Sequence, residues 1–342
     1  MQQRTNHQLS EYSLKTDRCA SILGTGSYLP EYIMTNAKLE SMVDTTDEWI
    51  RTRTGIRERR IAAAHETTSD MAAAAAAAAL KNASISAEEV SMIICATVTP
   101  DMFFPSTACF VQSKIGALHA VCFDVSAACS GFLYAMEIAR QFIASGQQKI
   151  ILVLGADKLS TIVNWKDRNT CVLFGDGAGA ALLGHREGSG GILATSMGSN
   201  GSLANILYTP GGGSAAPTTS ENVDQKLATI HMNGRETYKH AVKAMVDSSE
   251  KVLAQAGLTI NDITCIIPHQ ANLRIIEAIA DRLHVPLNLF HLNLDRYGNT
   301  SAAAVAIALH EAAQTKNFRP GDLILLVVFG GGLTWAASIV QW

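Results

Sequence analysis

Short apolar runs alternate along this chain with segments of helical periodicity. The runs at 150–154 and 323–327 are continuous and flanked by polar turns, a pattern typical of buried strands. Apolar residues over 131–139 and over 234–256 recur at the spacing of helices that bury one or more faces. Strands that alternate with helices in this way predict an α/β fold with parallel sheets covered by helices.

An internal repeat divides the chain. Residues 80–94 can be laid on residues 253–267, and both read as a helix end, a polar turn, an acidic residue and a strand. The same offset of 173 residues lays 150–154 on 323–327, so we expect two copies of one α/β unit. We therefore predict a polar N-terminal extension at 1–17, a first half at 18–187 and a second half at 188–342.

Composition excludes several classes of protein. Hydrophobic residues make up 48% of the 342 residues and charged residues only 17%, which predicts a large core. The formal net charge of -3 gives no reason to expect nucleic-acid binding. We expect no membrane segment, because no apolar run reaches the length of a span and the N-terminus lacks a signal-peptide core. The seven dispersed cysteines lack metal-type spacing and indicate reduced thiols in a cytoplasmic protein without a metal site.

The stretch 124–132 is the first candidate for chemistry. Residues 119–124 predict a short buried strand and a helix follows from Gly131, which puts Cys129 at a strand-to-helix turn among small residues. Unpaired N–H groups and the positive end of the helix dipole favour an anion there. We therefore expect Cys129 to lose its proton readily and to act as a nucleophile. The alternative is a buried structural cysteine.

Three further motifs supply groups that complement a thiol. His269 follows the strand predicted at 263–267, Asn299 precedes an alanine-rich helix, and a glycine-rich turn at 329–334 joins two strands. Taken singly, each has a structural alternative: a hydrogen-bonded histidine, a helix cap and a plain turn. The 173-residue offset carries Cys129 to Ala302, so a pseudo-dyad between the halves would bring Asn299 close to the thiol. Together these groups provide a nucleophile, two neutral donors and a backbone oxyanion hole for thioester chemistry.

The motifs at 127–132, 269–272, 298–301 and 330–335 carry a family resemblance. From about Ser21 to Trp342 the chain resembles a β-ketoacyl-acyl-carrier-protein synthase III, the initiating condensing enzyme of type II fatty-acid synthesis in the thiolase-fold superfamily. The resemblance implies a thiolase-like α/β fold of two duplicated βαβ-type halves with layered α/β/α/β/α arrangement.

The resemblance also implies the reaction, an acyltransferase activity that begins fatty-acid synthesis. An acyl-CoA primer would acylate Cys129, and malonyl-acyl carrier protein would then lose CO₂ and attack the acyl group. His269 and Asn299 would hold the malonyl thioester oxygen, while the N–H groups of Cys129 and Gly331 would form the other oxyanion hole. Acyl-CoA is a substrate here, and no cofactor is implied.

The residue types at the site favour this class over its relatives. Decarboxylation produces the carbanion directly, so no strong general base is needed. A thiolase would carry a second cysteine in the C-terminal glycine motif, and 329–332 has none. The elongating condensing enzymes use two histidines, whereas position 299 is asparagine. This selects the initiating class or its plant-type polyketide relatives.

Binding residues follow from the same resemblance. Trp49 and Arg168 would sandwich the adenine of CoA, and Arg53 would face its phosphate. Their structural alternatives are a half-buried core aromatic and solvated surface arginines.

The resemblance gives roles to four more residues. Phe104 would close the acyl pocket of the neighbouring subunit, which implies a homodimer, and Phe329 would gate the thiol. Lys239 and Arg274 would form part of a basic patch for the acidic carrier protein, although a solvated helix face is the competing interpretation.

The chain departs from the family pattern at Asn169, Arg235 and Ala336. These departures do not affect the expected chemistry of the thiol, but they leave the identity of the acyl-CoA primer undetermined. One alternative is a specialised paralogue that uses a longer, branched or aromatic acyl-CoA in secondary-metabolite or signal-molecule synthesis. Two others are a dinucleotide-dependent oxidoreductase, whose glycine fingerprint is missing, and a non-catalytic paralogue that only binds carrier protein.

Overall fold

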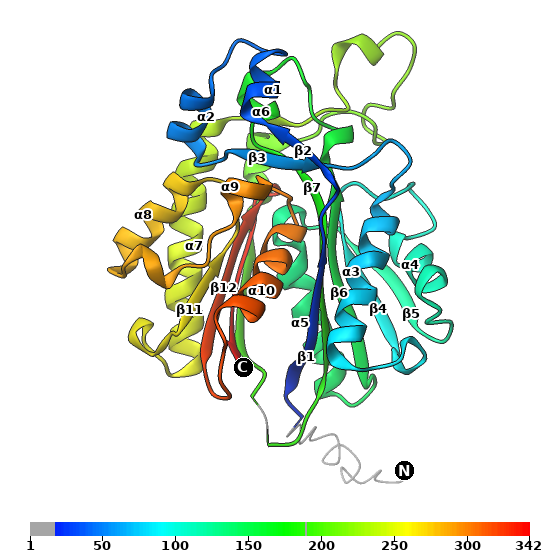
Figure 1. Cartoon of the computed structure of the whole chain (residues 1–342), viewed down its shortest axis with the longest axis vertical. Helices are drawn as coiled ribbons and strands as arrows, with labels where there is room; N and C mark the ends of the chain where they lie inside the picture. Colours follow the sequence, from blue (N-terminus) through cyan, green and yellow to red (C-terminus); the bar gives the residue numbers. More distant parts are fainter. Residues whose placement is uncertain (1–17, 189) are drawn as a thin grey trace, which may run out of the picture.

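The computed structural model describes residues 18–188 and 190–342, and two mixed sheets dominate it. The first is five-stranded with the order β1-β7-β6-β4-β5, and the second is four-stranded with the order β11-β12-β13-β8. Figure 1 shows the two sheets side by side with their strands running roughly along the long axis. The strands are β1 (Ala20–Tyr28), β4 (Met92–Ala96), β5 (Val121–Val125), β6 (Ile150–Lys158), β7 (Asp176–His185), β8 (Ile192–Ser199), β11 (Cys265–Pro268), β12 (Leu323–Gly330) and β13 (Thr334–Gln341).

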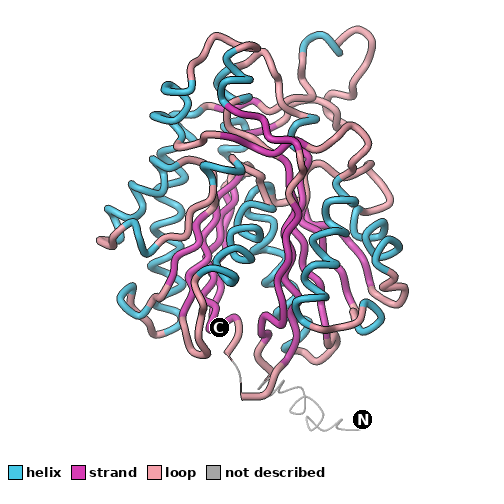
Figure 2. The backbone as a smooth tube through the Cα atoms, in the orientation of Figure 1, coloured by secondary structure: helices cyan, strands magenta, loops and turns pink. Residues whose placement is uncertain are grey.

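Helices form layers on both sides of each sheet. The two central helices, α5 (Gly131–Ala144) and α10 (Ala303–Thr315), share one apolar core with the facing sides of both sheets. Helices α3 (Thr68–Ala83) and α4 (Thr107–Ile115) cover the outer face of the first sheet, and α7 (Gly234–Ala256) and α8 (Leu273–Leu283) cover that of the second. The layers therefore run α/β/α/β/α, and Figure 2 shows the helices between and outside the strands. The layered arrangement expected from the sequence is confirmed.

Short elements gather at one end of the sheets, above the site. They are α1 (Asn36–Glu40), α2 (Asp47–Thr54), α6 (Arg168–Cys171), α9 (Leu294–Tyr297), the hairpin of β2 (Tyr32–Thr35) and β3 (Glu58–Ile61), and the pair β9 (Leu207–Tyr208) and β10 (His231–Met232). Figure 1 places α1, α2, β2 and β3 at the upper end of the molecule.

The prediction of parallel sheets is only partly right. Parallel pairing joins β4 to β5 and to β6 in the first sheet, and β11 to β12 in the second. The remaining pairs, including β6 with β7 and β12 with β13, are antiparallel. The physical reason is plain at β12 and β13, since the three residues between them are too few for a crossover connection.

The two sheets share an order of strands that fits the repeat. Strands β8-β13-β12-β11 of the second sheet follow the order of β1-β7-β6-β4 in the first. Adding 173 to Met92 and to Ile150 gives Cys265 and Leu323, the first residues of β11 and β12. The predicted boundary at 187/188 falls between β7 and β8. The division into halves at that point remains our proposal, and the predicted extension at 1–17 lies outside the described residues.

Two glycines let helices approach strands closely enough to build the site. A Cβ on Gly26 would lie 2.3 Å from the carbonyl oxygen of Ala75, so α3 packs its backbone directly on β1. A Cβ on Gly155 would lie 2.3 Å from the carbonyl oxygen of Ala302, at the start of α10. The second contact matters for function, because Asn299 and Ser301 lie immediately before Ala302.

We expect Gly155→Ala to destabilise the chain by about 1–3 kcal/mol, because the added methyl group must push Ala302 away. The matched control is Gly201→Ala, where a Cβ would meet nothing within 4 Å. Urea unfolding of both variants checks this expectation. Equal midpoints for the two variants would contradict a close contact between β6 and α10.

Candidate active site

Cys129 lies where the chain leaves β5 of the first sheet and meets the end of β12 of the second. It belongs to a short 3-10 turn, Ala128–Ser130, between β5 and α5, and only 8% of the residue is exposed. Ala128 adopts the left-handed conformation with φ of +45° in this turn, a strained choice for a residue with a Cβ. A Cβ on Gly330 would lie 2.7 Å from the backbone nitrogen of Cys129, so the end of β12 presses directly on the thiol-bearing residue.

The environment of Cys129 differs from our expectation of an acidic thiol. Burial raises the pKa of the Cys129 thiol to about 12, which outweighs the opposing effect of a hydrogen bond with Ser301. The thiol donates to Ser301 Oγ at a distance of 3.6 Å. The helix begins at Gly131 as expected, but the sulfur is removed from water, and this burial opposes the effect of the helix N-terminus. Before any substrate enters, Cys129 is therefore a protonated thiol.

His269 follows β11, as predicted from the sequence. Its backbone N–H donates to the carbonyl of Val327 at 2.8 Å, which continues the parallel pairing of β11 with β12 by one residue. The residue is 5% exposed, and its Nδ1 atom is buried without a hydrogen-bond partner among the described residues. Burial lowers the pKa of His269 to about 4, so the ring is neutral at pH 7. A neutral imidazole offers a hydrogen bond without contributing a charge.

The orientation of the Asn299 side chain is fixed by a hydrogen bond to its Oδ1 atom. Its backbone N–H donates to the carbonyl of Leu173 at 2.9 Å, and its Oδ1 accepts from the backbone N–H of Ser301 at 2.8 Å. These bonds leave the Nδ2 group as the donor for a ligand. The alternative role as a helix cap does not hold, because α10 begins at Ala303 with Ala302 in the N-cap position.

The three residues line one cavity of about 410 Å³. Phe329, buried at the end of β12, lines the same cavity beside them. Cys129 also lines a second cavity of about 460 Å³, together with Gly331, Ser301 and apolar side chains. The apolar lining of that second cavity comprises Val98, Phe103, Leu159, Ile162, Phe174, Leu207 and Ile230. Cys129 therefore stands between two cavities, and an acyl group on its sulfur could extend into the apolar one.

The aromatic and basic residues predicted to bind CoA lie together. Trp49 and Arg53 line the first cavity, and the guanidinium carbons of Arg53 and Arg168 lie 4.8 Å and 5.2 Å from the centre of the Trp49 ring. Arg168 also donates to the carbonyl of Asp44 at 2.8 Å. Arg168 thus occupies the space over the indole, and a flat base could stack there only after the guanidinium moves outward.

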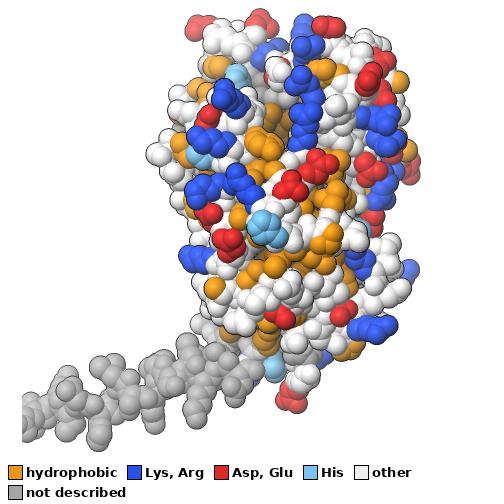
Figure 3. Space-filling view, turned by 90° about the vertical axis from the view of Figure 1, so that its left-hand side faces the viewer, with side chains coloured by type: hydrophobic (Ala, Val, Ile, Leu, Met, Phe, Trp, Pro, Cys, Tyr) orange, Lys and Arg blue, Asp and Glu red, His pale blue; other side chains and the backbone are white. Residues whose placement is uncertain are grey.

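The residues predicted to meet the carrier protein lie on the face of α7 and α8. Arg274 lines the mouth of the first cavity and donates to the carbonyl of Thr52 at 3.1 Å. Lys239 is 72% exposed, 3.8 Å from Glu236. Figure 3 shows Lys and Arg side chains gathered around hollows on this side of the molecule.

The remaining predicted residues are more scattered. Phe104 is 83% exposed and does not line either cavity of its own chain, whereas its neighbour Phe103 does. Of the residues that depart from the family pattern, Asn169 lines the first cavity, Arg235 is exposed on the first turn of α7, and Ala336 is buried in β13.

Sequence reasoning missed a buried carboxylate beneath the site. Asp157 Oδ1 accepts from Thr97, Val98 and Thr99, and its Oδ2 accepts from the backbone N–H of Ala302 at 3.2 Å. It thereby ties the first half to the start of α10, next to Ser301. The sequence did contain a signal for this role, because Asp157 is an acidic residue within the apolar strand β6. Ser301, which contacts the sulfur, belonged to a quoted motif but received no role of its own.

From the sequence we expect no metal cluster, membrane-spanning helix or disulfide bond, and the structure bears on these expectations over residues 18–188 and 190–342. Within these ranges no cluster of three or more His, Cys, Asp or Glu side chains could hold a metal ion. None of their helices combines the length and apolar character needed to cross a membrane. All seven cysteines fall in these ranges as unpaired thiols.

The buried His269 ring makes stability depend on pH. Its folded-state pKa of about 4 lies below the ordinary value of 6.5, so the unfolded chain takes up the proton first as the pH falls. The His269 contribution is therefore complete above about pH 6.5 and is lost toward pH 4. We expect wild type to lose on the order of 2 kcal/mol more than His269→Gln between pH 7 and 4.5 in urea unfolding. Exposed His119→Gln is the control, and parallel losses in all three proteins would contradict a buried neutral ring.

Comparisons with known proteins agree with the geometry. A family model described as 3-oxoacyl-[acyl-carrier-protein (ACP)] synthase III matches residues 123–201, and the C-terminal model of that family matches 253–342. The chain is 56% identical over 323 residues to a β-ketoacyl-[acyl-carrier-protein] synthase III from Caldanaerobacter subterraneus subsp. tengcongensis, covering 94% of this chain and 98% of the relative.

Solved structures give the same result. The 3-oxoacyl-[acyl-carrier-protein] synthase III from Aquifex aeolicus VF5 superposes with a TM-score of 0.88 at 49% identity, covering 94% of this chain and 100% of that one. The priming β-ketosynthase from the R1128 polyketide biosynthetic pathway gives 0.87 at 34% identity, covering 95% and 96%. The chain belongs to the β-ketoacyl-acyl-carrier-protein synthase III family of condensing acyltransferases, whose thiolase-like fold it shares.

Proposed function

We propose that this chain transfers an acyl group from acyl-CoA to Cys129 and then condenses it with malonyl-acyl carrier protein to give a β-ketoacyl-carrier product. The observation that carries the proposal is the position of Cys129. The thiol shares one cavity with His269 and Asn299 and also borders a second, apolar cavity. A nucleophile so placed has donors on one side and room for an acyl chain on the other.

Acyl transfer is the first step. The Cys129 sulfur attacks the thioester carbonyl of acyl-CoA, the bond to the CoA sulfur breaks, and the thiol proton ends on CoA. Since burial disfavours a thiolate here, the neutral acyl thioester suits the site better than the ionised cysteine does. We assign the N–H groups of Cys129 and Gly331 to the developing oxyanion, a role supported by the close packing of Gly330 on Cys129.

Decarboxylation and condensation follow. His269 and Asn299 Nδ2 donate to the malonyl thioester oxygen as CO₂ leaves and enolate charge develops. The enolate carbon then attacks the acyl-Cys129 carbonyl, and the cysteine sulfur departs. A single oxyanion donor is typically worth about 3–4 kcal/mol of barrier, and its effect is largest where water is excluded. The burial of both side chains supports this role.

The partners follow from the same proposal. Trp49, Arg53 and Arg168 bind CoA, and Lys239 and Arg274 meet the acidic carrier protein. We further propose a cytoplasmic homodimer without a cofactor, in which Phe104 enters the acyl pocket of the neighbouring subunit. The large exposed area of the Phe104 side chain supports a role against another chain.

A second candidate differs only in the primer. The apolar cavity of about 460 Å³ beside Cys129 in the single chain has room for a longer, branched or aromatic acyl group, which a specialised relative would take. The similarity to a priming β-ketosynthase of a polyketide pathway points in the same direction. Steady-state rates with acetyl, straight-chain, branched and aromatic acyl-CoA primers separate the two candidates.

The proposal predicts separate losses in the two steps. With acetyl-CoA and malonyl-carrier protein, Cys129→Ser should reduce condensation by at least about a thousandfold, because the hydroxyl is a poorer nucleophile and a poorer leaving group. His269→Ala should still take up the acyl group but lose about a hundredfold or more in CO₂ release. Product formation and CO₂ release measure the two effects. Full condensation by Cys129→Ser would eliminate the proposed nucleophile.

Base stacking predicts a selective effect at Trp49. Trp49→Ala should raise the KM for acyl-CoA about tenfold, since stacking on an aromatic ring contributes about 1–3 kcal/mol per base. Acylation by an acyl-pantetheine thioester, which has no adenine, should stay within twofold. Trp342→Ala is the control, because Trp342 packs on Phe318 and lines neither cavity. Equal effects on both acyl donors would show that Trp49 does not contact the base.

A further inference from the structure

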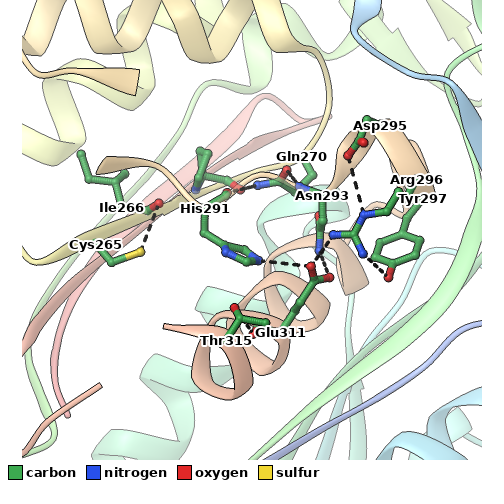
Figure 4. Close-up of polar contacts among 11 residues, drawn as sticks. Cys265, Ile266, Gln270, His291, Asn293, Asp295, Arg296, Tyr297, Glu311 and Thr315 are labelled. Atoms are coloured by element: carbon green, nitrogen blue, oxygen red, sulfur yellow. Dashed lines mark hydrogen bonds and ion pairs between the residues drawn. The ribbon is translucent and has the colours of Figure 1, made fainter. Parts of the chain in front are cut away.

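A polar network connects the residue that follows His269 to α9 and α10. Its members are Gln270 after β11, His291 and Asn293 in the following segment, Arg296 in α9 and Glu311 in α10 (Figure 4). Gln270 is 1% exposed and Asn293 is 2% exposed. Polar side chains buried so completely are costly unless their hydrogen bonds are satisfied.

The Gln270 side chain forms hydrogen bonds with the backbone before His269 and with the segment 291–293. Its Nε2 donates to the carbonyl of Pro268 at 2.8 Å and to the carbonyl of His291 at 3.1 Å. Its Oε1 accepts from the backbone N–H of Asn293 at 3.0 Å. The residues before and after His269 are thus tied to each other and to the segment 291–293. Since the Nδ1 atom of His269 has no partner, these backbone ties hold the histidine in place.

The network continues to the carboxylate of Glu311, whose side chain is 21% exposed. Asn293 Nδ2 donates to Glu311 Oε2 at 3.3 Å, and Arg296 donates to Glu311 Oε1. His291 Nε2 also lies 3.8 Å from Glu311 Oε1. Burial keeps the pKa of His291 below its ordinary value, and Arg296 forms the ion pair with Glu311.

The other end of the network reaches Asn299. Arg296 lies in α9, the short helix that ends at Tyr297, and the N–H of Gly298 closes it by donating to the carbonyl of Leu294 at 2.9 Å. Gly298 has a φ of +64°, and Asn299 follows it directly. Glu311 therefore anchors the segment that leads into Asn299 through Arg296, and the loop that carries His269 through Asn293 and Gln270.

We propose that Gln270, Asn293, Arg296 and Glu311 are positioning residues that set the separation of the His269 and Asn299 donors for the malonyl half-reaction. This inference rests on the proposed function. It adds that the four residues affect decarboxylation of the malonyl group and not acyl transfer to Cys129. Decarboxylation needs two side-chain donors on one oxygen atom, and a displacement of about 1 Å costs up to about a hundredfold in rate. Acyl transfer relies on the N–H groups of Cys129 and Gly331, and none of the network's hydrogen bonds among the described residues involves these groups.

The test compares two carboxylates that both lie near Arg296. Glu311→Gln keeps the shape of the side chain but removes the charge that holds Arg296. Asp295→Asn is the matched control, because Asp295 Oδ1 lies 3.9 Å from Arg296 Nε and its side chain is 45% exposed. Each full-length variant is assayed for acyl uptake from acetyl-CoA by intact mass and for CO₂ release from malonyl-carrier protein.

We expect Glu311→Gln to lower kcat for CO₂ release about tenfold or more while acyl uptake stays within twofold. Asp295→Asn should leave both steps within twofold. A residue that only stabilises the fold would lower both steps together, in proportion to the folded fraction. Equal losses in the two half-reactions, or no loss in either, would overturn the proposal.

A milder variant keeps the test decisive if Glu311→Gln does not fold. Asn293→Ala removes only the side-chain bond to Glu311 and retains the backbone bond to Gln270. It should show the same selective loss in CO₂ release, and an unselective effect would again contradict a positioning role. A wild-type chain that takes up no acyl group would instead refute the proposed function, so the two failures are distinguishable.

Discussion

The burial of Cys129 between the two sheets is the constraint on which the rest of the structure depends. The sulfur lies where β5, β12 and the start of α10 converge, and glycines at 155 and 330 permit backbone contacts that a side chain would block. Asp157 joins the segment that follows β4 to the start of α10, because it accepts hydrogen bonds from Thr97 and from the N–H of Ala302. The site therefore requires both sheets to be folded and packed on each other.

Removal from water determines the electrostatics of the site. It keeps the pKa of Cys129 at about 12 and that of His269 at about 4, so both side chains are neutral at pH 7. A neutral site suits a reaction in which charge moves from the malonyl carboxylate to the enolate oxygen as CO₂ leaves, because fixed donors stabilise a developing charge most strongly in a medium of low polarity. The chain thereby avoids a strong base, which a proton-abstracting enzyme would need.

Much of this arrangement was predictable from the sequence. The residue offset of 173 anticipated β11 and β12, and the apolar periodicity placed α7 at the bounds it has in the structure. The prediction that Asn299 lies near Cys129 agrees with their shared cavity. The helix-dipole argument for an acidic thiol left out the opposing effect of burial, because the local pattern shows the turn but not how deeply it is buried. The parallel pairing was wrong for β13, whose short connection to β12 carries no hydrophobic signal of strand direction. Asp157 and Ser301 were missed because their partners lie far away in the sequence. The Gln270 network was missed because its bonds depend on how β11, α9 and α10 pack together.

The proposed mechanism requires a covalent acyl group on Cys129, one of the seven thiols of the chain. The most direct test is to mix the protein with a panel of acyl-CoAs, quench it, digest it and locate the added mass among the cysteine-containing peptides. We predict one acyl group per chain, on the peptide that contains Cys129, with no acylation of the other six cysteines. Acylation at another cysteine, or no adduct with any acyl-CoA on folded protein, would contradict the central role given to Cys129.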